Sequence, residues 1–199
     1  RSFIRVWGSN EFGISNDLLI PLEKGKVLTN AKQITRTDKQ AQIMYFMLVD
    51  RFKNGDKSND HPLNRPDVNH KVDYWGGDLS GLKQTIDDGY FKRLGVNTLW
   101  ISPLNENPTE PYGFYAPKNT KFSGYHGYWP ISSSKVDFRF GTNQELKSLV
   151  ADAHTKDMNI LLDYVAHHVH KEHPFYKEHP ELATPLYLPD GTLNTERWD

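Results

Sequence analysis

Hard oxygen donors are concentrated in one short stretch of the chain. The run Asn54-Gly55-Asp56-Lys57-Ser58-Asn59-Asp60 is followed by Gly76-Gly77-Asp78. Ca²⁺ takes about six to eight oxygens from carboxylates, amides and carbonyls, and a flexible loop supplies such a set well. The stretch is not an EF-hand, because Arg65 stands where the bidentate Glu would be. The same composition is typical of a solvated Asn/Asp/Gly turn, so the residues alone leave both interpretations open.

A second stretch is rich in aromatic side chains. Between positions 112 and 129 there are seven of them: Tyr112, Phe114, Tyr115, Phe122, Tyr125, Tyr128 and Trp129. An aromatic ring can bury the apolar C–H face of a sugar while the hydroxyls at the sugar's edge keep their hydrogen-bond partners. The alternative is that the rings hold a long loop together, which is what we expect for Phe114, Phe122 and Tyr125.

A third group consists of histidines near the C-terminal end of the sequence: His167, His168, His170, His173 and His179. Neutral imidazole is the commonest metal ligand in proteins, so a histidine-metal hydrolase is one hypothesis. Two observations argue against it. Adjacent residues such as His167 and His168 point to opposite faces of a strand, and no HExxH spacing occurs.

The elements that must position these residues follow from apolar periodicity. Residues 43–49, 96–101 and 159–165 are nearly continuous apolar runs, typical of parallel strands covered on both faces. An amphipathic helical pattern spans residues 79–94, and a second begins after Thr142, a good N-cap. The order strand, helix, strand, helix, strand predicts an α/β fold with right-handed crossovers.

The loop lengths favour one α/β architecture. Each helix leads into the next strand through a short link, Gly95 or residues 156–158, whereas the strand-to-helix loops are long, residues 50–78 and 102–141. Long loops at strand carboxyl ends are typical of a (β/α)8 TIM barrel. A nucleotide-binding sheet would need a Gly-rich turn after its first strand, and the sequence there is Asp50-Arg51-Phe52-Lys53. Three strands cannot close an eight-stranded barrel, so we expect the first part of one.

The flanking segments predict the domain organisation. Residues 3–7 alternate like a strand, so residues 1–40 are interpreted as the tail of a β-sandwich domain and a linker. Residues 41–168 hold the first three β/α units of the barrel. Residues 169–199 are polar and proline-rich, and we interpret them as the start of a domain inserted after the third strand.

Composition excludes several function classes. The 199 residues carry 24 Lys+Arg and 25 Asp+Glu, a formal net charge of -1, so we expect no nucleic-acid partner. No apolar run approaches the roughly 20 residues that a membrane span needs. The chain has no Cys, which excludes disulfides, thiolate zinc sites and Cys nucleophiles. It begins at Arg1 with no signal peptide, so we expect that the true N-terminus lies upstream or has been removed.

Four segments, taken in order, resemble the α-amylase family, glycoside hydrolase family 13. They are residues 44–52 (MYFMLVDRF), 94–103 (LGVNTLWISP), 125–129 (YHGYW) with 136–142 (VDFRFGT), and 163–168 (DYVAHH). They are similar to the N-terminal part of the family's catalytic domain, in neopullulanase- or cyclomaltodextrinase-like enzymes or α-amylases.

The resemblance implies a role for individual residues. Tyr128 matches the tyrosine that stacks on the sugar at the cleavage point, with His126 beside it and Trp129 in the same sugar-binding loop. His168 matches a histidine that hydrogen-bonds the sugar's 6-hydroxyl. Asp163 is expected to orient an arginine and a nucleophile that come later in the chain. A calcium ligand set is implied at Asn54, Asp56, Asn59, Asp60 and Asp78, with a backbone oxygen at Gly76. His167 replaces the usual Asn of a second calcium site, and imidazole is a poor Ca²⁺ ligand.

The resemblance also implies a function. We expect a retaining glycoside hydrolase that acts on α-1,4-glucans, such as starch, maltooligosaccharides or cyclodextrins, and is secreted or periplasmic. The family's catalytic Asp, Glu and Asp follow the fourth, fifth and seventh strands, so we expect them beyond this chain, in the remainder of the polypeptide. The isolated 199 residues are accordingly expected to be inactive. A non-catalytic α-glucan-binding relative of the same fold is the alternative, and a histidine-metal hydrolase is the second.

Overall fold

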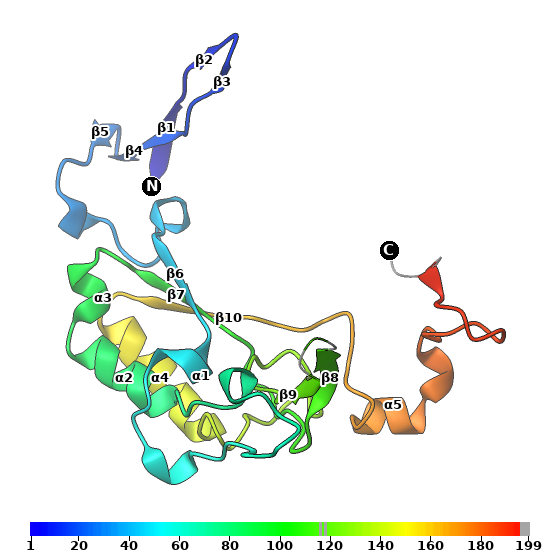
Figure 1. The fold of residues 1–199 in the computed structure, drawn as a ribbon. Coiled ribbons are helices and arrows are strands. Elements are labelled where there is room, and N and C mark those ends of the chain that lie inside the picture. The colour runs from blue at the N-terminus through cyan, green and yellow to red at the C-terminus, as the bar shows by residue number, and fades with distance from the viewer. Residues whose placement is uncertain (116, 118, 196–199) are drawn as a thin grey trace.

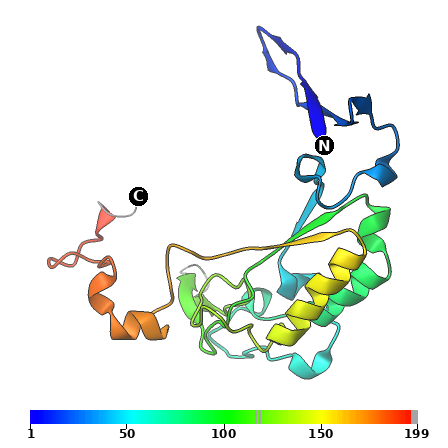
Figure 2. The same ribbon diagram turned by 180° about the vertical axis from the view of Figure 1, so that it is seen from behind.

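The computed structural model describes residues 1–115, 117 and 119–195, and its centre is a three-stranded parallel sheet. The strands β6 (Met44–Met47), β7 (Thr98–Ile101) and β10 (Asn159–Leu162) lie in the order β10-β7-β6, so chain neighbours are also sheet neighbours. Helices α2 (Leu79–Asp87) and α4 (Asn143–Thr155) lie on the same side of this sheet (Figures 1 and 2). The predicted sequence of parallel β/α units is confirmed.

The core fills the space between the sheet and these helices. Leu99 and Ile101 of β7 are buried with Leu82 of α2 and Leu149 of α4 in one apolar cluster. Burying such side chains contributes about 1.5–3 kcal/mol each, which fixes the helices against the strands.

The opposite face of the sheet differs from the prediction that both faces are covered. Phe46, Trp100 and Leu161 stand in register across the three strands, and they are 47%, 39% and 47% exposed. The Phe46 and Trp100 rings meet edge to face at 5.0 Å, and the described part of the chain leaves all three side chains partly exposed. The apolar runs therefore include a face that the described residues cover only in part.

The first predicted helix is two helices. The chain leaves α2 at Asp88, turns at Gly89 in the left-handed region (φ 75°), and resumes as α3 (Tyr90–Arg93). The Asp88 carboxylate accepts a hydrogen bond from the Tyr90 N–H at 2.8 Å across this turn. The second prediction is confirmed, because Thr142 is the N-cap of α4. It forms a reciprocal capping box with Glu145.

The N-terminal segment forms an antiparallel arm that extends away from the α/β body (Figure 1). Strand β1 (Ser2–Val6) pairs with β4 (Leu18–Glu23), which pairs with β5 (Lys26–Val27). The tip of the arm is a short hairpin of β2 (Ser9–Asn10) and β3 (Gly13–Ile14). The predicted strand is confirmed, and the β-sandwich domain remains a prediction.

The remaining elements are short and lie in the loops. They are α1 (Val49–Phe52), β8 (Tyr112–Tyr115), β9 (Thr120–Phe122), α5 (Pro174–Glu178) and the 3-10 turns Ala31–Gln33, Lys39–Ala41, Lys57–Asn59, His70–Val72 and Pro180–Leu182. Among the described residues, no helix combines the length and apolar character needed to cross a lipid bilayer.

Candidate functional site

The aromatic loop is held against the carboxyl ends of the strands. Gly127 has φ +84° and its α-carbon lies so close to β7 that an added Cβ would be 2.1 Å from the Pro103 carbonyl oxygen. Only glycine tolerates both the left-handed backbone and this approach. The loop 125–129 is therefore placed at the end of the sheet where barrel enzymes carry their active sites.

Tyr128 connects this loop to the end of β10. Its hydroxyl donates a hydrogen bond to Asp163 Oδ2 at 2.6 Å. Burial, followed by this hydrogen bond to a carboxylate, raises the pKa of Tyr128 to about 12, so the hydroxyl keeps its proton. His168 Nε2 donates to the Tyr128 carbonyl at 2.8 Å, so its imidazole anchors the same residue.

His126 lies beside Tyr128 with its ring held in one tautomer. The Tyr128 N–H donates to His126 Nδ1 at 3.0 Å, so the ring proton is on Nε2 and is available as a donor. Burial, with a smaller contribution from the Arg51 charge, lowers the pKa of His126 to about 4, so the ring is neutral at pH 7. The ring is stacked on Tyr128 at 5.9 Å and meets Trp129 edge to face at 4.6 Å.

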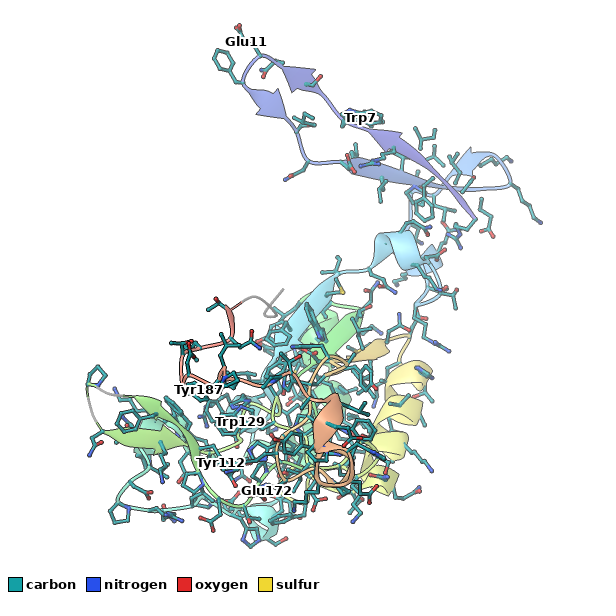
Figure 3. The ribbon with its side chains drawn as sticks, turned by 90° about the vertical axis from the view of Figure 1, so that its right-hand side faces the viewer. Trp7, Glu11, Tyr112, Trp129, Glu172 and Tyr187 are labelled. Atoms are coloured by element: carbon teal, nitrogen blue, oxygen red, sulfur yellow. The ribbon has the colours of Figure 1, made fainter. Side chains whose placement is uncertain are left out.

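Trp129 is enclosed by residues that come from two further segments. The main-chain N–H of Trp129 donates to Asn107 Oδ1 at 2.9 Å, and the Trp129 ring meets Tyr112 edge to face at 6.1 Å. Tyr112 in turn donates a hydrogen bond to the Glu172 carboxylate and contacts the His170 ring at 4.3 Å. Figure 3 labels Tyr112, Trp129 and Glu172, which come together where β8 meets the segment after β10.

The structure thus brings together the four residues predicted to bind the sugar, His126, Tyr128, Trp129 and His168, and it places Asp163, predicted as a supporting residue, beside them. Of the rings predicted to hold the loop, Tyr125 packs against the core and Phe122 lies half-buried in β9 against Gly113, whereas Phe114 is 62% exposed. Sequence reasoning missed Asn107, Tyr112, His170 and Glu172 as supports.

A buried ion pair lies beneath Trp129. Arg139 donates to both oxygens of Asp137, at 2.8 and 2.7 Å, and to the Asn107 carbonyl at 3.0 Å. Asp137 also accepts from the Asn107 N–H at 2.9 Å. The spacing Asp137-Phe138-Arg139 in the sequence was the available signal, because it puts two charges where an otherwise apolar segment enters α4.

Asp163 also borders a cavity of about 300 Å³ between β10 and the start of α4. Its walls combine apolar side chains, including Leu104 and Leu162, with Ser133 and Lys147. The cavity lies beside the aromatic loop and not inside it, so Asp163 is the residue common to both.

The predicted calcium loop folds around Asp78 and Asp60. Asp78 is the N-cap of α2 and accepts N–H bonds from Gly55, Asp56 and Gly81. Asn59 Nδ2 donates to Asp78 at 3.5 Å, and Asn54 Nδ2 donates to Asp60 at 2.7 Å. Gly76 closes over the second pair, because a Cβ there would be 2.2 Å from Asp60 Oδ1.

Two amide oxygens in this loop have no partner. Asn54 Oδ1 and Asn59 Oδ1 are buried and accept no hydrogen bond. A buried acceptor left unpaired is costly, and a bound cation would satisfy it, so the donor set fits Ca²⁺. Asp56 lies apart from the set: its exposed carboxylate accepts from Ser58, at 2.9 Å from N and 2.6 Å from Oγ.

The histidines do not assemble a metal centre in the described part of the chain, where no three His, Asp or Glu side chains converge to hold an ion. The expectation that His167 and His168 point apart on a strand is wrong. Strand β10 ends at Leu162, and the two rings meet, with 2.9 Å between His167 Nε2 and His168 Nδ1. His173 serves as the N-cap of α5, where it accepts from the Phe175 N–H at 3.1 Å.

Parallel β/α units with an aromatic, hydrogen-bonded site at the strand carboxyl ends are the architecture of part of a β/α-barrel protein. The family model for "Alpha amylase, catalytic domain" matches residues 46–187. The chain therefore belongs to the α-amylase family, glycoside hydrolase family 13.

Individual relatives agree with this assignment. The chain is 38% identical to a cyclomaltodextrin glucanotransferase of Klebsiella oxytoca over 67% of its length and 20% of that protein. It is 36% identical to the periplasmic α-amylase of Escherichia coli (strain K12) over 77% of its length and 22% of that protein. The crystal structure of an Anoxybacillus α-amylase superposes with a TM-score of 0.57 at 35% identity, over 72% of this chain and 28% of that one. The chain thus spans about a fifth of the curated relatives it matches.

Proposed function

We propose that this chain is the N-terminal part of a retaining glycoside hydrolase that acts on α-1,4-glucans and is exported from the cytoplasm. One observation carries the proposal: the Tyr128–Asp163 hydrogen bond, which draws the aromatic loop onto the end of β10. It places an apolar ring, the His126 Nε2 donor and a carboxylate side by side, and a sugar ring needs both kinds of surface.

Hydrolysis would proceed by double displacement, with two carboxylates about 5–5.5 Å apart. We assign neither of these carboxylates to this chain. Its own residues bind and orient: Tyr128 offers an aromatic face, His126 donates from Nε2, and Asp163 holds the Tyr128 hydroxyl. His168 fixes the Tyr128 main chain. For His168 Nε2 to donate a hydrogen bond to a sugar hydroxyl, that hydroxyl has to replace the Tyr128 carbonyl as the acceptor.

The test is glucan binding by the full-length protein that carries these residues. Isothermal titration with maltoheptaose should give a dissociation constant that Trp129→Ala raises about 5- to 150-fold, because loss of an aromatic ring from the binding site costs about 1–3 kcal/mol. Trp7→Ala is the matched control, since Trp7 lies 57% exposed on the N-terminal arm.

Turnover separates the proposal from its alternative. Release of reducing sugar from starch by the full-length protein supports the hydrolase, and binding without turnover supports a non-catalytic relative. The isolated residues 1–199 are expected to release none, because we assign neither catalytic carboxylate to them. Measurable turnover by residues 1–199 alone would overturn that assignment.

We further propose that Asn54, Asn59, Asp60, Gly76 and Asp78 hold a structural Ca²⁺, with Asp56 completing the set if its side chain turns from Ser58. Calcium would tie the loop 54–60 to the segment before α2. A ligand that binds only the folded state raises stability by about 2.7 kcal/mol at 100 times its Kd. The melting temperature should therefore rise with added CaCl2 and fall with EGTA.

The variant pair for the calcium site is Asn59→Ala and Asn16→Ala. Asn59→Ala removes one of the unpaired oxygens and should weaken the calcium response, whereas Asn16 is exposed in the N-terminal arm. A response to Zn²⁺ but not to Ca²⁺ would contradict the calcium site and favour a histidine-metal protein.

A further inference from the structure

Arg51 lies between the calcium loop and the sugar loop. It belongs to α1, directly after β6, and its side chain is only 21% exposed. Its guanidinium carbon is 3.8 Å from the centre of the Tyr125 ring and 5.0 Å from the centre of the Trp75 ring. A guanidinium held between two aromatic faces stacks on both, and a lysine ammonium cannot reproduce that planar contact.

The same guanidinium fixes the segment that leads into the calcium loop. It donates to the Asp73 carbonyl at 2.8 Å, to the Lys71 carbonyl at 3.3 Å and to the Asp50 carboxylate. Arg51 therefore contacts the chain before Gly76 at its main chain and, through Trp75, at a side chain.

Asp50 transmits this placement to Gly76 itself. Its carboxylate accepts from the N–H groups of Trp75 at 3.0 Å and Gly76 at 3.3 Å. Its main-chain carbonyl accepts from the Gly77 N–H at 2.9 Å. The Gly77 N–H and the Gly76 carbonyl share one planar trans peptide and point in opposite directions, so Asp50 sets where the Gly76 oxygen points. That oxygen is a member of the proposed calcium set.

On the other side, Arg51 meets the sugar loop. Tyr125, on which it stacks, contacts His126 with 5.3 Å between ring centres. The Arg51 charge also disfavours a proton on His126, in addition to the effect of burial. A shift of Arg51 thus reaches His126 through both the Tyr125 ring and the electric field.

We propose that Arg51 is a positioning residue that couples calcium binding in the 54–60/76–78 loop to glucan binding in the 125–129 loop. The inference rests on the proposed function, since it requires both sites. Calcium that takes the Gly76 oxygen stabilises the arrangement of Asp50, Trp75 and Arg51, and this arrangement holds Tyr125 and His126 in place. Coupling between two ligands is reciprocal, so the glucan must tighten calcium by the same factor.

The experiment measures both dissociation constants in the full-length protein by isothermal titration. Maltoheptaose is titrated with saturating CaCl2 and with EGTA, and Ca²⁺ is titrated with and without saturating maltoheptaose. We expect each ligand to tighten the other about fivefold, at the lower end of typical coupling. Arg51→Lys keeps the charge but loses the stack, and it should bring both factors close to one. Arg93→Lys is the control, because Arg93 is exposed on α3 and contacts Asp88.

The possible outcomes separate the two proposals. If either ligand fails to bind the wild type, that site is wrong and the coupling with it. If both bind with affinities independent of each other, only the coupling is overturned. If Arg51 has only a structural role, Arg51→Lys will have a lower melting temperature but unchanged fivefold coupling factors. That result also overturns the coupling proposal. Should Arg51→Lys not fold, Tyr125→Phe and Tyr125→Leu take its place. Tyr125→Phe, which preserves the ring, must keep the fivefold coupling factors, and Tyr125→Leu must lose them.

Discussion

At the scale of single residues, the proposed sugar site consists of groups whose protonation is fixed by their neighbours. His126 accepts the Tyr128 N–H at Nδ1 and is therefore neutral, with its ring proton on Nε2. Tyr128 keeps its hydroxyl proton because it is partly buried and hydrogen-bonded to Asp163. Both residues thus present defined donors and ring faces near neutral pH, and no titration in this pair has to precede sugar binding.

The lowered pKa of His126 predicts a pH dependence of stability. The unfolded histidine takes up a proton near its ordinary pKa of 6.5, whereas the folded one does so near 4. Between these values the unfolded state binds more protons, so stability falls as the pH drops from 6.5 to 4, by at most about 3 kcal/mol. Urea unfolding at several pH values measures this fall in the free energy of unfolding. Many carboxylates add their own slope, so the comparison is with His126→Gln, whose stability should fall less over the same interval. Parallel pH profiles for the two proteins would contradict the burial of a neutral His126.

At the scale of elements, close backbone approaches decide where the loops lie. Gly127 against Pro103 seats the aromatic loop on the end of β7, and Gly76 against Asp60 seats the calcium loop in front of α2. A side chain at position 127 would collide with the Pro103 main chain, which has little freedom to move, whereas one at position 76 would collide with the side chains of Asp60 and Asn54.

Substitution of Gly127 tests this. In Gly127→Ala the new methyl group meets the Pro103 carbonyl at 2.1 Å in a left-handed backbone with φ +84°. Gly25→Ala is the matched control, since Gly25 has φ +76° and nothing within 4 Å of the added Cβ. The control should lose about 1–2 kcal/mol from backbone strain alone. Gly127→Ala should lose more than about 3 kcal/mol and also weaken maltoheptaose binding. Equal losses in urea unfolding would mean that the approach to Pro103 does not constrain the loop.

The elements also show how far the sequence is informative. Apolar runs and short helix-to-strand links predicted β6, β7 and β10 in parallel order, and Thr142 with Glu145 marked the start of α4. The break at Gly89 was missed because the apolar face of the helical pattern continues across it from Ile86 to Tyr90.

The long-range contacts of the site were not predicted in this way. The family resemblance singled out Asp163 and Tyr128 separately, with an arginine and a nucleophile later in the chain as the partners of Asp163. The hydrogen bond between these two residues, 35 positions apart, was not predicted. The stack of Arg51 on Tyr125 could not be predicted, since both residues fall in the long loops to which the sequence assigns no direction, and the four-residue helix α1 was not predicted. The Tyr112–Glu172 bond is hidden for the same reason, because both partners come from irregular segments.

At the scale of the whole molecule, the described chain carries an apolar surface that its fold leaves open. Phe46, Trp100 and Leu161 form one row on the face of the sheet opposite the helices, and β6 and β10 are both edge strands. In a closed barrel this face is the interior, filled with layers of side chains, and further strands pair with both edges. The row therefore has a different environment in residues 1–199 alone than in a complete barrel.

The same substitution should consequently act in opposite directions in the two contexts. Residues 1–199 alone should self-associate through this face, and Phe46→Ser should weaken the association seen by sedimentation velocity. In the full-length protein, Phe46→Ser should instead lower the free energy of unfolding by about 3–5 kcal/mol, because a large buried side chain is lost from a packed core. Phe12→Ser is the control in both, since Phe12 lies 89% exposed at the tip of the N-terminal arm. A full-length protein that tolerates Phe46→Ser as well as Phe12→Ser has no closed barrel over this sheet.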